Sequence, residues 1–268
     1  MFEENILDQH VHSMDYRPDN LIFEFFTKEQ VKNLYYNCMR VDIPDNNIKA
    51  EMIKAYLPSK EFDELGTGTN RMAFLHNGLV VKIALDRRGI VDSYTEFKRS
   101  IELPAYLAKT YESNLLISIQ QYVNVMDKAQ FMSNEPVIKE MLAELSEDYL
   151  FEDLGYNLDN CYNWGYIESE DGPELRILDY GYLYPLALQD KKKLFRCPVC
   201  GSKLKWDSNY VKLICDSPTC SYKIRPFMLK DKMNNIYEDL ENETINTLNN
   251  LKLPNFKDIE KLITNIKK

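Results

Sequence analysis

The stretch Leu65–Glu96, LGTGTNRMAFLHNGLVVKIALDRRGIVDSYTE, carries the clearest structural signal in the chain. Apolar residues fill two short runs, Met72–His76 and Leu79–Leu85, and the dipeptide Asn77-Gly78 separates them. Asn-Gly between apolar runs is a strong signal for a two-residue hairpin, because both turn positions need a positive φ. The sequence therefore predicts an antiparallel β-hairpin here.

Lys82 stands in the middle of the second run, between Val81 and Ile83. A lysine in an apolar strand is costly to bury unless an anion neutralises it. The upstream glycines, Gly66 and Gly68, would let backbone N–H groups come close to phosphate oxygens. The hairpin therefore suggests a phosphate-binding site, and the alternative is a surface hairpin whose lysine extends to solvent.

The composition is that of a globular protein. Of the 268 residues, 44% are hydrophobic and 28% are charged, and the formal net charge is −9. This charge argues against a surface that is a nucleic-acid footprint throughout. Apolar runs stay well short of a membrane span, and the acidic start MFEENILDQH has no signal-peptide pattern. We therefore expect a cytosolic or virion protein that makes no membrane contact.

Helical and strand-like patterns alternate along the chain. Thr27 and Gln30 match a capping box at the start of an amphipathic helix. Ser93 is the predicted N-cap of the helix that carries Glu96. The other predicted elements are helices at Ile48–Leu57, Asp92–Leu103 and Asn134–Leu150, and strands at Glu61–Leu65, Tyr106–Tyr111, Leu115–Val123, Trp164–Ile167 and Leu175–Leu178. This mixture predicts an α+β fold.

The order of these pieces resembles the protein-kinase fold, and more closely the compact kinase-like proteins encoded by bacteriophages. A glycine loop, the strand lysine Lys82, the helix glutamate Glu96, a strand pair, a long helix and the sequence ILDYG around Asp179 follow one another between about residues 60 and 185. An aspartate that ends an apolar strand just before a glycine is costly without a ligand. The resemblance implies two lobes, with a reduced C-terminal lobe, and a site for ATP and Mg²⁺.

The resemblance also implies a role for each residue of this site. Lys82 would neutralise the α- and β-phosphates, and Glu96 would orient Lys82. Asn163 and Asp179 would hold Mg²⁺, a hard cation that prefers oxygen ligands. The remaining nucleotide contacts would come from the phosphate-covering glycines Gly66 and Gly68 and from the adenine-facing hinge residues Gln121 and Val123.

Two features depart from the family pattern. Arg71 replaces the third glycine of the phosphate loop, where it could reach a phosphate or fill the pocket. The family places its catalytic aspartate five residues before the metal-binding asparagine, and Leu158 occupies that position. Asp153 lies ten residues before Asn163, and Asp159 lies four residues before it. We expect Asp153 to be the base if the loop carries an insertion, Asp159 if it carries a deletion, and a pseudokinase if neither side chain reaches.

Four of the six cysteines have the spacing of metal ligands. Cys197 and Cys200 form a CxxC pair, and Cys215 and Cys220 form a second pair spaced by four. Two such pairs joined by a β-hairpin suit a tetrahedral Cys₄ Zn²⁺ site. The sequence therefore predicts a structural zinc ribbon, in which the metal supplies folding energy to a small module. The predicted hairpin strands are Leu204–Trp206 and Tyr210–Ile214.

The segment around the ribbon is basic. Residues 191–232 contain eleven Lys or Arg against three Asp. Together with exposed Trp206, Tyr210 and Tyr222, this charge would suit a phosphate backbone with stacked bases. The alternative is that the ribbon docks on the acidic kinase-like body and replaces the missing part of the C-terminal lobe. Both alternatives stay open on the sequence.

These patterns divide the chain into four predicted segments: a helical N-terminal extension at 1–59, a kinase-like domain at 60–190, a zinc ribbon at 191–230 and a helical tail at 231–268. The first functional hypothesis is an ATP- and Mg²⁺-dependent phosphotransferase acting on a Ser, Thr or Tyr hydroxyl of a protein. The second is an inactive pseudokinase that serves as a phage virion or host-interaction module. The third is a zinc-ribbon nucleic-acid binder. The expected partners are a nucleotide, a protein substrate or binding partner and nucleic acid, in the host cytoplasm or the virion.

Overall fold

The computed structural model describes residues 21–38, 43–57, 61–186 and 195–229. They form two compact units. Unit 1 holds the described residues up to Ile101 together with Lys109–Tyr122, and unit 2 holds Glu102–Ala108 and the described residues from Val123 onward. Each unit is built of both helices and strands, so the predicted α+β class is confirmed.

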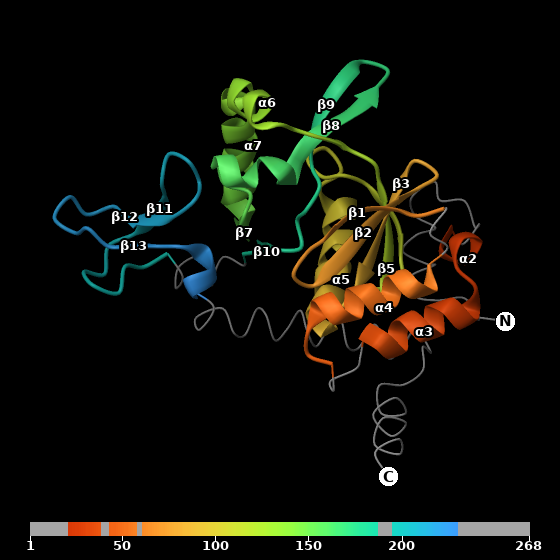
Figure 1. Ribbon diagram of the computed structural model, residues 1–268. Coiled ribbons are helices and arrows are strands. Elements are labelled where there is room, and N and C mark those ends of the chain that lie inside the picture. The colour runs from red at the N-terminus through yellow and green to blue at the C-terminus, as the bar shows by residue number, and fades with distance from the viewer. Residues whose placement is uncertain (1–20, 39–42, 58–60, 187–194, 230–268) are drawn as a thin grey trace, which may run out of the picture. The chain divides into compact units, whose positions relative to one another are not determined.

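Unit 1 contains a five-stranded antiparallel sheet (Figure 1). The predicted hairpin is confirmed at its centre, where Asn77 and Gly78 both have positive φ, 49° and 75°. The strand order is β1-β2-β3-β5-β4. The strands are β1 (Asp63–Thr67), β2 (Arg71–His76), β3 (Leu79–Ala84), β4 (Thr110–Ser113) and β5 (Ile117–Gln121). Strand β3 lies between β2 and β5, and all of its side chains except that of Leu79 are buried.

Four helices belong to the same unit: α2 (Leu21–Phe25), α3 (Lys28–Cys38), α4 (Asn46–Tyr56) and α5 (Arg87–Glu102). The predicted capping box is confirmed, because the Thr27 and Gln30 side chains each accept a hydrogen bond from the other residue's backbone N–H. The helices and the sheet share one buried apolar cluster, which includes Phe26, Leu34 and Ile53 from the helices. The N-terminal helices therefore contribute to the core of unit 1.

Helix α5 begins earlier than the sequence predicts. Its first residue is Arg87, and Ser93 lies buried inside the helix rather than at its N-cap. The cap is supplied by Asp86, whose side chain accepts a 2.8 Å hydrogen bond from the backbone N–H of Gly89. An aspartate at this position satisfies a donor that the first turn leaves open, which explains the earlier start.

Unit 2 has its own buried cluster, built around side chains such as Phe131, Leu142 and Trp164. The strands predicted at Trp164–Ile167 and Leu175–Leu178 are present as β8 (Trp164–Ser169) and β9 (Gly172–Ile177), which pair as a hairpin. Strand β6 (Asn124–Val125) pairs with β8 to make a three-stranded sheet. A second, two-stranded sheet pairs β7 with β10. The elements are β6 (Asn124–Val125), α6 (Lys128–Ser133), α7 (Glu135–Asp148), β7 (Tyr149–Phe151), the 3₁₀ helix η1 (Leu158–Asn163), β8 (Trp164–Ser169), β9 (Gly172–Ile177) and β10 (Leu183–Pro185).

The cysteine-rich end of unit 2 forms a small three-stranded sheet, and we call residues 195–229 the ribbon. Its elements are β11 (Leu204–Trp206), β12 (Leu213–Cys215), β13 (Lys223–Ile224) and the 3₁₀ helix η2 (Pro226–Leu229). Strand β12 begins three residues later than predicted. Tyr210 has a positive φ of 56°, and the Asp207 side chain accepts a hydrogen bond from Val211 N–H, so this segment is a turn.

In the described part of the chain, none of the helices has the length and apolar character that crossing a bilayer requires. The helical tail predicted at 231–268 lies outside the described residues, as does the start of the predicted N-terminal extension. The resemblance to the kinase fold stays a prediction.

Candidate functional site

The predicted phosphate loop connects β1 and β2 in unit 1. Gly68 closes a tight turn, because its backbone N–H donates to the Arg71 carbonyl at 2.8 Å. The loop is held from two neighbouring elements. Asn46, the first residue of α4, donates its side-chain amide to the Thr69 carbonyl at 2.7 Å, and Leu85 N–H donates to the Asn70 carbonyl at 2.8 Å. Hydrogen bonds from Asn46 and Leu85 therefore hold the loop backbone in place.

Lys82 and Glu96 form the ion pair that the resemblance implies. The Lys82 ammonium lies 3.0 Å from each carboxylate oxygen of Glu96. Both residues are buried, with Glu96 fully enclosed in the interior of unit 1. The centre of β3 and one face of α5 therefore bring together two charges that lie fourteen residues apart in the sequence.

Arg71 contacts the same carboxylate, a pairing that the sequence analysis missed. Its guanidinium nitrogens lie 2.7 and 2.9 Å from the two oxygens of Glu96. Burial alone raises the pKa of Glu96, but Arg71 first and Lys82 second offset this effect and hold the pKa at about 2. The register of β2 against β3 brings the two cations close together. Arg71 of β2 stands opposite Ala84 of β3, and Lys82 of β3 stands opposite Ala73 of β2. Arg71 is thus one of two cations gathered on one buried carboxylate.

Of the predicted hinge residues, Gln121 ends β5 and Val123 is buried in unit 2. The backbone N–H of Gln121 donates to the Lys109 carbonyl at 2.8 Å, and its side-chain oxygen accepts from Lys109 N–H at 3.3 Å. The backbone donor of Gln121 is therefore engaged within unit 1.

The second group of predicted residues lies in unit 2, around the turn that follows β7. The side-chain amide of Asn163 donates a 2.8 Å hydrogen bond to the backbone carbonyl of Asp153. Asn163 also accepts, through its own carbonyl, a 3.0 Å hydrogen bond from the N–H of Leu178, the neighbour of Asp179. Two segments that carry predicted site residues therefore meet at Asn163.

Asp153 has an unusual backbone and an unusual carboxyl group. Its φ is +61°, a conformation that few residues other than glycine adopt. Desolvation and the neighbouring carboxylate of Asp179 raise its pKa above the usual range, and the Arg225 guanidinium lowers it in part. The carboxyl groups of Asp153 and Asp179 therefore lie near enough for one to affect the pKa of the other.

Asp159 stands elsewhere in the same loop. It lies exposed in η1, where its backbone N–H faces the Asn157 side-chain oxygen at 3.4 Å. The described contacts connect Asp153, rather than Asp159, with Asn163 and Asp179. Which of the two aspartates would act as the base stays a prediction.

The four ribbon cysteines come together as predicted. The sulfur atoms of Cys197, Cys200, Cys215 and Cys220 all lie within 4.8 Å of one another, close enough to hold a single metal ion. The Cys197–Cys220 and Cys200–Cys215 sulfur distances are 3.7 and 3.4 Å. Four soft sulfur donors at one point are compatible with Zn²⁺.

The aromatic residues of the ribbon are less exposed than predicted. Trp206 stacks on Phe151, with ring centroids 4.7 Å apart and planes 8° from parallel, and Tyr210 packs beside Trp206 at 6.3 Å. Both side chains are partly buried against the apolar cluster of unit 2, and Tyr222 is also only partly exposed. The prediction that these three aromatic side chains are exposed was wrong. Apolar side chains of unit 2 cover part of Trp206 and Tyr210.

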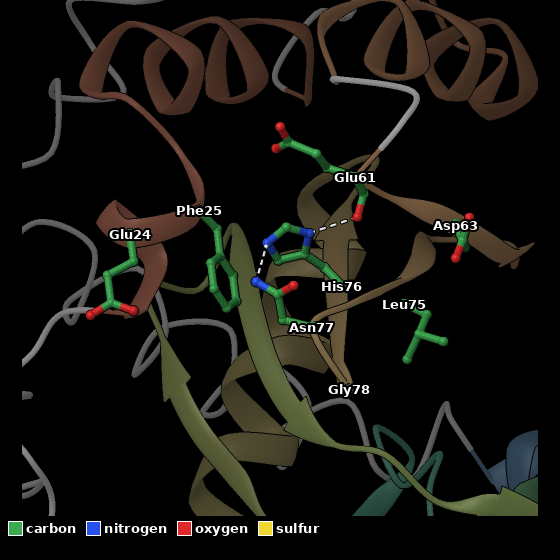
Figure 2. A pocket seen from close by; sticks show the side chains of 8 residues that line it. All are labelled: Glu24, Phe25, Glu61, Asp63, Leu75, His76, Asn77 and Gly78. Carbon is green, nitrogen blue, oxygen red and sulfur yellow. Dashed lines mark hydrogen bonds between the residues drawn. The ribbon is translucent and has the colours of Figure 1, made fainter.

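One further hollow lies in unit 1, beside the hairpin turn (Figure 2). The His76 ring sits between the Glu61 carbonyl oxygen, 2.7 Å away, and the Asn77 side-chain amide, 3.1 Å away. It also stacks on Phe62 at 4.3 Å. The predicted site residues do not line this hollow. Its lining residues are Glu24, Phe25, Glu61, Asp63, Leu75, His76, Asn77 and Gly78.

Comparisons with models of known protein families and with curated proteins find no match to this chain.

Proposed function

We propose that this chain is a kinase-like, ATP- and Mg²⁺-dependent phosphotransferase that modifies a Ser, Thr or Tyr hydroxyl of a protein. The observation that carries the proposal is the contact between Asn163 and the Asp153 turn, with the Asp179 carboxylate close by. In this proposal the three residues, which come from separate parts of the chain, act together at one acidic site. An arrangement of this kind has a clear use in phosphoryl transfer, where positioning and charge stabilisation supply most of the catalysis.

Unit 1 would supply the cation for the nucleotide. Lys82 is buried in a central strand and is held by a carboxylate, which keeps its ammonium in one place. A lysine positioned in this way neutralises phosphate oxygens without losing the entropy of a free side chain. Arg71 shares the Glu96 carboxylate and would place a second cation at the same phosphates.

Unit 2 would supply the groups for the acceptor. Asn163 and Asp179 offer the oxygen ligands for Mg²⁺, which would neutralise charge on the phosphates. Asp153 would accept the proton of the hydroxyl as its oxygen bonds to the γ-phosphorus and the bond from phosphorus to the bridging oxygen of ADP breaks. The raised pKa of Asp153 suits this role, because a base works best when its pKa approaches the working pH. The four cysteines would hold Zn²⁺ as a structural ion.

A nucleotide-binding pseudokinase is the second candidate. It is favoured by one observation: Arg71 lies on the same carboxylate that would orient Lys82. If Arg71 keeps Glu96 from orienting Lys82 for transfer, the chain binds ATP but does not transfer phosphate. The two candidates differ in transfer and agree in nucleotide binding.

The test uses the full chain with γ-labelled ATP and Mg²⁺, and measures both label transfer to the protein or a generic substrate and the ATP-dependent thermal shift. We expect both, and we expect Lys82→Met to lower transfer by about 10²-fold or more. The matched control is Lys54→Met, which removes a partly exposed lysine of the same unit that also pairs with carboxylates. A thermal shift without transfer would select the pseudokinase, and the absence of both would overturn the proposal.

A further inference from the structure

The ribbon lies directly on the turn that carries Asp153. Trp206, the last residue of β11, stacks on Phe151, the last residue of β7. Two residues beyond Asp153, the backbone of Gly155 packs against the ribbon turn at Tyr210. Both sides of this contact belong to unit 2. The ribbon therefore borders the acidic cluster through packed side chains and backbone.

The contact includes a hydrogen bond between main chains. Tyr156 N–H donates to the Asn209 carbonyl at 2.7 Å. A Cβ atom on Gly155 would lie 2.4 Å from the Tyr210 carbonyl oxygen, so this approach needs glycine. Because the Gly155 backbone packs this closely and the Tyr156 N–H is paired, the Asp153 turn has little room to shift.

Asp153 depends on outside support more than an ordinary residue does. Its positive φ costs of order 1 kcal/mol or more for a residue that has a Cβ, and such strain persists only where surrounding contacts enforce it. Support from within the body of unit 2 comes from the Asn163 amide and from the Trp164 indole, which donates to the Leu154 carbonyl at 3.2 Å. Support from the other side comes from the ribbon.

The ribbon in turn depends on its four cysteines. Its three strands have three, three and two residues, too few to make an independent core. Cys215 stands opposite Leu204 in the β11–β12 pair, and the turn that touches Gly155 connects these two strands. Metal binding at the cysteines would therefore order the strands that present Trp206 and Tyr210.

We propose that the ribbon is a metal-dependent clamp on the Asp153 turn, in which Trp206, Asn209 and Tyr210 act as positioning residues. Loss of the metal would release the turn while the Lys82–Glu96 pair of unit 1 stays formed. The catalytic reading of this clamp rests on the proposed function, whereas the clamp itself is a structural claim that can be tested without it.

The direct test is hydrogen exchange at the Tyr156 amide, comparing the full chain loaded with Zn²⁺ and the same chain after chelation. We expect exchange at Tyr156 to quicken at least about tenfold, while amides of the β2–β3 hairpin in unit 1 keep their rates. Unchanged exchange at Tyr156 while ribbon amides open would overturn the clamp. Equal acceleration in unit 1 would overturn it as well, because the metal would then support the whole chain rather than this turn.

A variant with intact cysteines separates the contact from the metal. Gly155→Ala should speed exchange at Tyr156 while zinc content stays at the wild-type value, because the added Cβ pushes the ribbon turn away. The control is Tyr222→Ala, which removes a ribbon aromatic outside this contact and should leave Tyr156 unchanged. If Gly155→Ala leaves the exchange rate at its wild-type value, the clamp is refuted. If the wild type lacks phosphoryl transfer, the proposed function fails and these exchange rates still decide the clamp.

Discussion

The side-chain amide of Asn163 donates a 2.8 Å hydrogen bond to the main-chain carbonyl of Asp153, ten residues earlier in the chain. Because the bond uses the nitrogen of the amide, the side-chain oxygen of Asn163 is left available for a cation. The same bond holds the turn in which Asp153 adopts a positive φ. One asparagine therefore connects the two functions that the proposal assigns to this cluster, metal binding and positioning of the base.

Replacing Asn163 tests this double role. Asn163→Ala should lower phosphoryl transfer by about 10²-fold, because both the metal ligand and the support of Asp153 are lost. The free energy of unfolding should fall by only about 1 kcal/mol, the usual value of a single hydrogen bond. Steady-state transfer and denaturant unfolding measure the two effects. A loss of stability without a loss of transfer would show that Asn163 serves the fold alone.

The Glu96 carboxylate should make stability depend on pH in the acid range. Its pKa in the folded chain is about 2, against an ordinary value of 4.5. Because folding lowers this pKa, the contribution to the free energy of unfolding is fully present above pH 4.5 and is lost as the pH falls toward 2. The total is about 3 kcal/mol.

Denaturant unfolding between pH 5 and pH 2 measures this contribution. Glu96→Gln should destabilise the chain at pH 7, because it leaves the Arg71 and Lys82 cations without their carboxylate. It should also flatten the pH dependence, because glutamine does not titrate. Glu51→Gln, which removes an exposed carboxylate of the same unit, should leave the slope unchanged. A wild-type slope in Glu96→Gln would contradict the assigned ion pairs.

The hairpin and the cysteine site could be predicted from local sequence because short-range chemistry specifies both. The two-residue turn at Asn77-Gly78 needs positive φ, and the spacing of the paired cysteines alone predicts a metal site. The contact of Asn163 with the Asp153 turn could not be predicted in this way. It depends on the path of the loop and on the packing of the ribbon, and neither leaves a periodic signal in the sequence.

The pairing of Arg71 with Glu96 was missed for a similar reason. The two residues lie twenty-five positions apart, and their meeting depends on the register of β2 against β3 and on the phase of α5. The exposure of Trp206 was mispredicted because its partner, Phe151, comes from another sheet of unit 2. Local composition describes an aromatic on a basic strand and cannot reveal what covers it.

Metal content tests the cysteine cluster. The purified chain should carry one Zn²⁺, and Cys197→Ser should remove most of it and lower the melting temperature, because one of four thiolate ligands is lost. Cys38→Ala changes a buried cysteine of unit 1 that lies outside the cluster, so it should keep the metal. Elemental analysis after gel filtration gives the stoichiometry. Equal zinc content in wild type and Cys197→Ser would show that the cluster is not the metal site.

The most direct test of the central claim compares two aspartates of one loop. Phosphoryl transfer from γ-labelled ATP is measured for wild type, Asp153→Asn and Asp159→Asn, with the ATP-dependent thermal shift as a check on nucleotide binding. The account predicts that Asp153→Asn loses about 10²-fold or more of the transfer rate and keeps its thermal shift, while Asp159→Asn stays within about twofold of wild type. Loss of transfer in Asp159→Asn with full activity in Asp153→Asn would contradict it.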